Sequence, residues 1–155
     1  MSVSEDVYRE LILQHSRTPR HFGGLPGATH AAAGDNPLCG DSYQVRLKLD
    51  ADGIIREASF EGVGCAISKA SASLMLDAVI GRSRADFEHL FRDFHEVVRG
   101  GPEAQAAQAR LGKLAAFSGS WKYPSRVKCA ILCWHAVRSA LAGEARASTE
   151  EGAPA

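Results

Sequence analysis

The fold is decided by residues 42–61, which read SYQVRLKLDADGIIREASFE. Apolar and polar residues alternate along the first half of this stretch, the period of a strand with one buried face. The Asp52-Gly53 pair is a strong hairpin-turn signal, so residues 54–61 are expected to return as the partner strand. The residues expected to face inward on this hairpin are Tyr43, Val45, Leu47, Leu49, Ala58 and Phe60. We expect a third short strand before Gly62.

Helical periodicity dominates the rest of the chain. Five helices are expected, from Ser4 to before Pro19, from Cys65 to Gly81, from Ser83 to Gly100, from Glu103 to Phe117 and from about Ser125 to Leu141. Residues 17–38 are rich in Gly and Pro and are interpreted as an ordered loop.

The order of these elements predicts an α+β fold, a small antiparallel three-stranded sheet packed on one face by about five helices. We expect one domain over residues 1–142 and a disordered tail over residues 143–155, which are small and polar.

Composition excludes several classes of function. The 18 basic and 18 acidic residues are interspersed and give a formal net charge of zero, which predicts no nucleic-acid partner. No apolar run approaches the roughly 20 residues of a membrane span. The N-terminus is acidic and has no apolar signal core, so we expect a cytoplasmic protein. In a reducing compartment the four cysteines indicate metal binding or catalysis rather than two disulfides.

Three cysteines and one aspartate have the neighbours of metal ligands. Cys39 and Asp41 lie in NPLCGD, Cys65 lies in EGVGCAIS, and Cys129 ends RVKC. Three thiolates and one carboxylate give the four donors of a tetrahedral zinc site. Asp41 is also open to interpretation as a turn residue. The fourth cysteine, Cys133, lies among apolar residues and is interpreted as a small buried hydrophobe.

The same contexts predict reactivity. Cys65 stands at a helix start, and Cys129 is flanked by Arg126 and Lys128 in the expected first turn of the last helix, and both settings favour a thiolate. Cys39 lies in a turn beside Gly40, so it is the ligand best able to leave the metal and act as a nucleophile. Whether Arg126 and Lys128 attract a sulfur donor or form a solvated helix end stays open, as does a ligand role for His21 and His30 in the loop.

These motifs resemble the U-type iron–sulfur assembly proteins of the IscU/SufU (NifU N-terminal-like) superfamily. The resemblance covers most of the chain, from the first helix with Pro19-Arg20-His21-Phe22-Gly23 to the last helix. Scaffold members usually carry His before the last cysteine, where this chain has Lys128, and their spacing from Cys65 to Cys129 is shorter than the 64 positions found here. The chain is therefore more similar to the SufU branch.

The resemblance implies a zinc-bound sulfurtransferase with Cys39, Asp41, Cys65 and Cys129 as ligands and Cys39 as the sulfur acceptor. Its donor would be a PLP-dependent cysteine desulfurase of the SufS type, and its product would pass to the downstream SUF assembly machinery. One alternative is a scaffold that binds iron or assembles a [2Fe–2S] cluster on the same residues. A second alternative is a structural zinc module that binds a partner without chemistry.

Overall fold

The computed structural model describes residues 5–36 and 40–148 of the 155-residue chain. The α-helices are α1 (Glu5–Arg17), α2 (Ala66–Val79), α3 (Arg84–Arg99), α4 (Ala104–Leu111) and α5 (Pro124–Leu141). The strands are β1 (His30–Asn36), β2 (Asp41–Leu49), β3 (Ile55–Val63) and β4 (Arg146–Ser148). Two short 3₁₀ turns, η1 (Gly112–Phe117) and η2 (Ser120–Lys122), connect α4 to α5.

The predicted hairpin forms the centre of the sheet. Strands β2 and β3 pair antiparallel with Val45 opposite Phe60 and Leu47 opposite Ala58, and the strand residues predicted to face inward are buried, except that Leu49 is only partly so. Leu49 lies where the register of the two strands shifts. The Asp50 side chain accepts hydrogen bonds from the backbone N–H of Asp52 and Ile54, which closes the turn.

The α+β prediction is confirmed, with three antiparallel strands and five α-helices, but the third strand is not the one expected. It is β1, which pairs with β2 inside the segment interpreted as a loop. Its sequence HAAAGDN has little intrinsic strand preference. Small residues are required there because α5 lies close, and a Cβ added at Gly34 would be 3.3 Å from both Leu132 and Ala136.

Residues 146–148, within the segment expected to be a tail, form strand β4. The sheet order is β3-β2-β1-β4, and β4 pairs parallel with β1. The backbone N–H of Ala33 donates to the carbonyl of Ala145, and Arg146 approaches Asp35 at 3.3 Å. Strand β1 has an edge that β2 does not cover, and its free backbone N–H and C=O groups can pair with another strand. Such main-chain pairing needs no apolar side chains, so the small and polar residues of β4 can form it. Residues 149–155 lie outside the described part of the chain.

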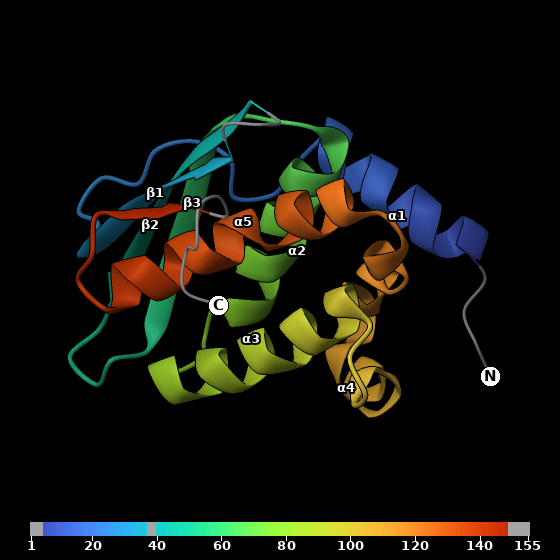
Figure 1. The fold of residues 1–155 in the computed structure, drawn as a ribbon. Helices are drawn as coiled ribbons and strands as arrows, with labels where there is room; N and C mark the ends of the chain where they lie inside the picture. The colour runs from blue at the N-terminus through green and yellow to red at the C-terminus, as the bar shows by residue number, and fades with distance from the viewer. Residues whose placement is uncertain (1–4, 37–39, 149–155) are drawn as a thin grey trace.

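The helices cover one face of the sheet (Figure 1). Helix α5 lies against β1, β2 and β4, α2 packs beside it, and α3 packs against α5 from outside. Trp134 of α5 is fully buried and stacks on Phe94 of α3 with ring centroids 4.3 Å apart. Among the described residues, no helix has both the length and the apolar character needed to cross a membrane.

Most helix boundaries agree with the sequence. Ser83 caps α3 by accepting a hydrogen bond from the Asp86 N–H, and Gly100 ends the helix with φ of 67°. The helix predicted to reach Phe117 stops at Leu111, because Gly112 adopts φ 57° and ψ −128°, which no α-helix accommodates. The chain continues as η1.

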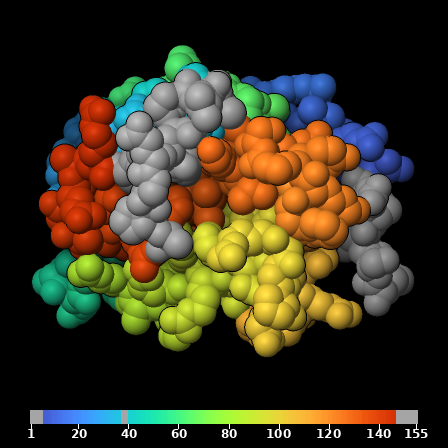
Figure 2. Space-filling model, in the orientation of Figure 1, coloured from blue at the N-terminus to red at the C-terminus, as the bar shows by residue number. Residues whose placement is uncertain are grey.

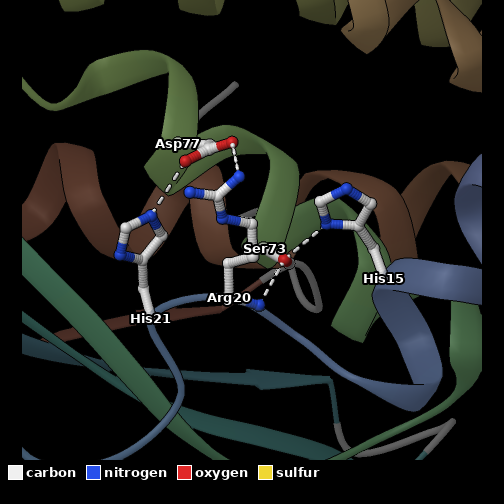
Figure 3. A network of polar contacts seen from close by, with 5 residues as sticks. All are labelled: His15, Arg20, His21, Ser73 and Asp77. Atoms are coloured by element: carbon white, nitrogen blue, oxygen red, sulfur yellow. Dashed lines mark hydrogen bonds and ion pairs between the residues drawn. The ribbon is translucent and has the colours of Figure 1, made fainter.

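A cluster of polar groups, here called the polar clasp, fastens residues 15–21 to α2 (Figure 3). Ser73 accepts the backbone N–H of Arg20 at 2.8 Å and shares a hydrogen bond of 2.7 Å with Nδ1 of His15. Asp77, one turn further along α2, contacts His21 at 3.0 Å and Arg20 at 3.3 Å. The clasp fixes α2, and the opposite end of α2 carries Cys65.

Candidate metal centre

The structure brings together the three predicted ligands that it describes. Asp41 is the first residue of β2, Cys65 is the N-cap of α2, and Cys129 lies in α5. One ligand atom of each lies within 4.8 Å of the other two. Cys39, the fourth predicted ligand, lies outside the described residues, so its place in the centre stays a prediction.

Asp41 uses one carboxylate oxygen to stabilise the fold and leaves the other without a hydrogen bond. Its side chain is only 2% exposed, and Oδ1 accepts the backbone N–H of Cys65 at 3.0 Å. This bond ties the start of β2 to the start of α2. Oδ2 is buried and has no hydrogen-bond partner. A buried carboxylate oxygen without a partner is costly, and a metal ion would satisfy it.

Cys65 is held at the start of α2 by a small polar network. Its Sγ accepts the backbone N–H of Ser68 at 3.4 Å, which confirms the predicted helix start. The Ser68 hydroxyl shares a 2.9 Å hydrogen bond with the hydroxyl of Tyr43. These two hydroxyls occupy the space that a side chain at position 64 would need, so only glycine fits before Cys65.

Cys129 differs from expectation in two ways. Because α5 begins at Pro124, this cysteine lies in the second turn rather than the first. Burial raises the pKa of its thiol above the ordinary value, and contacts with Asp41 and Cys65 raise that pKa further. The expected thiolate-favouring effect of basic neighbours is therefore not found, and the Arg126 guanidinium lies over the ring of Tyr123 at 4.4 Å.

The donor set fits a zinc ion. A divalent cation reverses the electrostatics of such a site, because it stabilises the deprotonated thiols and the carboxylate together. Zn–S bonds of about 2.3 Å and Zn–O bonds of about 2.1 Å place tetrahedral ligand atoms about 3.5–4 Å apart. Ligand atoms within 4.8 Å of one another need only a small contraction.

The remaining candidates lie elsewhere. His21 belongs to the polar clasp, and His30 shares a hydrogen bond with Thr29. Cys133 is 1% exposed in the core, where burial raises the pKa of its thiol, in agreement with its interpretation as a small hydrophobe.

Sequence reasoning missed Asn36, whose side chain is 0% exposed with neither amide atom hydrogen-bonded. Asn36 is the first residue of the NPLCGD motif, and this position was the sequence feature that could have identified it.

A small sheet covered by helices, with aspartate and cysteine side chains gathered where β2, α2 and α5 meet, defines an α+β protein with a candidate metal site. Residues 7–130 match the family described as NifU-like N terminal domain. The chain belongs to this family.

Relatives and solved structures agree with this assignment over nearly the whole chain. An iron–sulfur cluster assembly scaffold protein IscU of Streptococcus pyogenes is 38% identical over 95% of this chain and 90% of the relative. The zinc-dependent sulfurtransferase SufU of Bacillus subtilis is 36% identical over 90% of this chain and 92% of the relative. A crystal structure described as a putative iron–sulfur cluster assembly scaffold protein for the SUF system, from Fervidobacterium islandicum, superimposes with a TM-score of 0.78 and 29% identity. It covers 90% of this chain and 99% of that one.

Proposed function

We propose that this protein serves iron–sulfur cluster assembly as a zinc-dependent sulfurtransferase of the cytoplasm, with Cys39 as the sulfur acceptor. The observation that carries the proposal is the convergence of the Asp41, Cys65 and Cys129 donors within 4.8 Å of one another. Lys128 adds to it, because it occupies the position at which the resemblance places a scaffold histidine.

Cys39 is proposed as the fourth ligand on grounds of chain connectivity. Only Gly40 separates it from Asp41, so it is within reach of the same ion. Gly40 has φ of 75°, and its N–H donates to the carbonyl of Asn36 at 2.9 Å, which bends the chain back toward β2. A bound zinc ion would supply the positive charge that keeps the thiols deprotonated at neutral pH.

The transfer step follows from thiolate chemistry. The Cys39 thiolate attacks the terminal sulfur of a persulfide carried by a SufS-type, PLP-dependent cysteine desulfurase. A new S–S bond forms at Cys39, the S–S bond of the donor breaks, and its electron pair leaves with the donor cysteine as a thiolate. Asp41, Cys65 and Cys129 would be the residues that keep the metal ion bound during this exchange.

A groove beside the centre supports docking of that partner. It has a volume of about 580 Å³ and lies where the chain after Cys65 meets α1 and the start of α5. Its charged lining residues are all basic, namely Arg9, Lys122 and Arg126. Figure 2 shows the start of α5, in orange, exposed between α1 in blue and the yellow helices. An acidic surface on the desulfurase would complement this groove.

The transfer proposal is tested with Cys39→Ala, and Cys133→Ala serves as a matched control that removes a thiol from the core. Each protein is mixed with a SufS-type desulfurase and cysteine, and persulfide on the chain is measured by alkylation and mass spectrometry. We expect the persulfide in the unmodified and Cys133→Ala proteins and none in Cys39→Ala. Persulfide formation in folded Cys39→Ala at the unmodified level would contradict the proposal. Unfolding of Cys39→Ser would instead indicate a structural zinc module.

A second candidate is a scaffold on which a [2Fe–2S] cluster is built, with iron and sulfide as its cargo. It is favoured by the IscU relatives of Streptococcus pyogenes and Thermotoga maritima, which are 38% and 37% identical to this chain. Anaerobic reconstitution with iron and sulfide separates the two functions. A brown protein that transfers its cluster to an apo-acceptor indicates the scaffold, whereas a colourless chain retaining one zinc indicates the transferase.

A further inference from the structure

Asn36 is the most anomalous polar residue in the described part of the chain. Four buried side-chain N or O atoms there have no hydrogen-bond partner, and three of them belong to Asn36 and Asp41. Leaving a buried polar group unpaired costs about 1–3 kcal/mol. The hydrogen bond between Asn36 and Gly40 does not explain why the Asn36 side chain is an amide, because Asn36 makes this bond with its backbone carbonyl.

The register of the sheet places Asn36 beside the candidate metal centre. Asn36 of β1 and Asp41 of β2 are direct cross-strand partners, and the Cβ atoms of such pairs are about 4.5–5.5 Å apart. Alternation along β1 puts Asn36 on the same face as Gly34, which packs beneath Leu132 and Ala136 of α5. Asn36 is therefore covered by the helix that carries Cys129.

The chemistry of the centre explains why an amide would lie there. The thiolates of Cys65 and Cys129 and the carboxylate of Asp41 together outweigh the charge of a zinc dication, and of these three residues Asp41 and Cys129 are buried while Cys65 is exposed. An asparagine side chain offers two N–H donors and carries no charge of its own. Donors of this kind orient metal ligands and strengthen binding, and their loss typically weakens metal affinity 10–100-fold.

We propose that Asn36 is a positioning residue of the metal centre, and that its side-chain amide donates hydrogen bonds to the metal-bound ligands, of which Asp41 is its direct neighbour. This role rests on the zinc centre of the proposed function but is independent of sulfur transfer. It assigns the orphaned amide of Asn36 and the orphaned oxygen of Asp41 to one site.

The test compares Asn36→Leu, which has similar volume and no donors, with Asn36→Asp, which has the same shape. Ser59→Ala is the control, because Ser59 carries the other buried unpartnered atom and lies on β3 opposite Arg46. Zinc affinity is measured by competition with a chromogenic chelator. We expect a loss of about 10–100-fold in Asn36→Leu, a larger loss in Asn36→Asp, and no change in Ser59→Ala.

A second measurement distinguishes positioning from simple packing. Thermal unfolding in the presence of a chelator should show Asn36→Leu at least as stable as the unmodified protein, because an unpaired amide has been removed. In the unmodified protein, the side-chain N–H signals of Asn36 should shift and exchange more slowly when zinc is added.

Zinc affinity within twofold of the unmodified protein in Asn36→Leu would overturn the inference. If Asn36→Leu does not fold, the zinc affinity of Asn36→Asp is the deciding measurement. An affinity equal to or higher than that of the unmodified protein would overturn the inference. If the unmodified protein binds no zinc, the proposed function itself is contradicted. If an Asn36 variant binds zinc as tightly as the unmodified protein and sulfur transfer still depends on Cys39, only the proposed role of Asn36 is wrong.

Discussion

Two polar clusters contact helix α2, one through Ser73 and Asp77 and the other at its N-cap Cys65, and they differ in how their polar groups are satisfied. In the polar clasp, Ser73 and Asp77 are hydrogen-bonded or ion-paired to residues 15–21 of the same chain (Figure 3). At the other end, Asp41 holds the Cys65 N–H with one oxygen and leaves the second unpaired, and its neighbour Asn36 is unpaired as well.

The comparison separates a structural cluster from a candidate functional one at two places along the same helix. Buried polar groups in native proteins are almost always hydrogen-bonded. A cluster satisfied by its own chain therefore needs nothing further and stabilises the fold. A cluster with unpaired buried atoms is complete only with something the chain does not supply, and at this corner the sulfur donors indicate a metal ion.

The largest expected effect is the loss of the metal from Asp41→Asn. This change keeps the shape of the side chain and the oxygen that accepts from the Cys65 N–H, but it removes the anionic ligand. We expect bound zinc, measured by atomic emission on the purified protein, to fall from about one per chain to a small fraction, with affinity reduced more than about 100-fold.

Asp35→Asn is the matched control for that experiment. It makes the same substitution on β1, where Asp35 contacts Ser42 and Arg146 at the surface. The control should retain the full zinc content. Full occupancy in Asp41→Asn would show that the Asp41 carboxylate is not needed to hold the metal, and its unpaired oxygen would then not mark a ligand.

An intermediate effect is expected from Ser73→Ala in the polar clasp. The change leaves the His15 ring and the Arg20 N–H without their partner, and we expect the free energy of unfolding to fall by about 1–3 kcal/mol. Urea denaturation measures the loss, and zinc affinity should not change. Ser16→Ala, which removes a hydroxyl bonded to Leu13 within α1, should have little effect. A large loss of zinc affinity in Ser73→Ala would mean that the two ends of α2 are coupled.

The smallest effect is a dependence of stability on pH through His15. Burial lowers the pKa of His15 below 6.5 in the folded protein, so the unfolded chain takes up the proton first as pH falls. The stabilising contribution is present above pH 6.5 and is lost as pH falls through the lowered pKa.

His135 acts in the same direction, because burial lowers its pKa to about 4. His15→Gln should therefore flatten the fall in unfolding free energy between pH 7 and 5 without abolishing it. The measurement is a series of urea titrations with a chelator present. An identical fall in the variant would exclude His15 as a source of the pH dependence.

The parts of the fold that the sequence predicted are those with strong local signals. Alternation identified the β2–β3 hairpin, and the Ser83 cap with its apolar stripe identified α3. Strand β1 was missed because its Ala and Gly residues are dictated by the approach of α5, which no local pattern records. Strand β4 was missed for a related reason, since its pairing depends on an open edge formed a hundred residues earlier.

The same division holds within the site. Asp41, Cys65 and Cys129 each have a distinctive local context, and their convergence was predicted from three short motifs. Asn36 was missed because its burial is created by the overlying α5 rather than by its neighbours in the sequence. Cys39 lies outside the described residues, and its roles as ligand and acceptor remain predictions.

The parallel pairing of β4 has a practical consequence for anyone preparing the protein. Ser148 is the partner of Asp35, the residue immediately before Asn36, so the chain leaves the sheet at the corner where the ligands gather. A hexahistidine tag fused directly after Ser148 would begin beside the ligands and offer imidazoles to their ion. Metal content should accordingly be measured on protein whose tag is at the other terminus or has been cleaved.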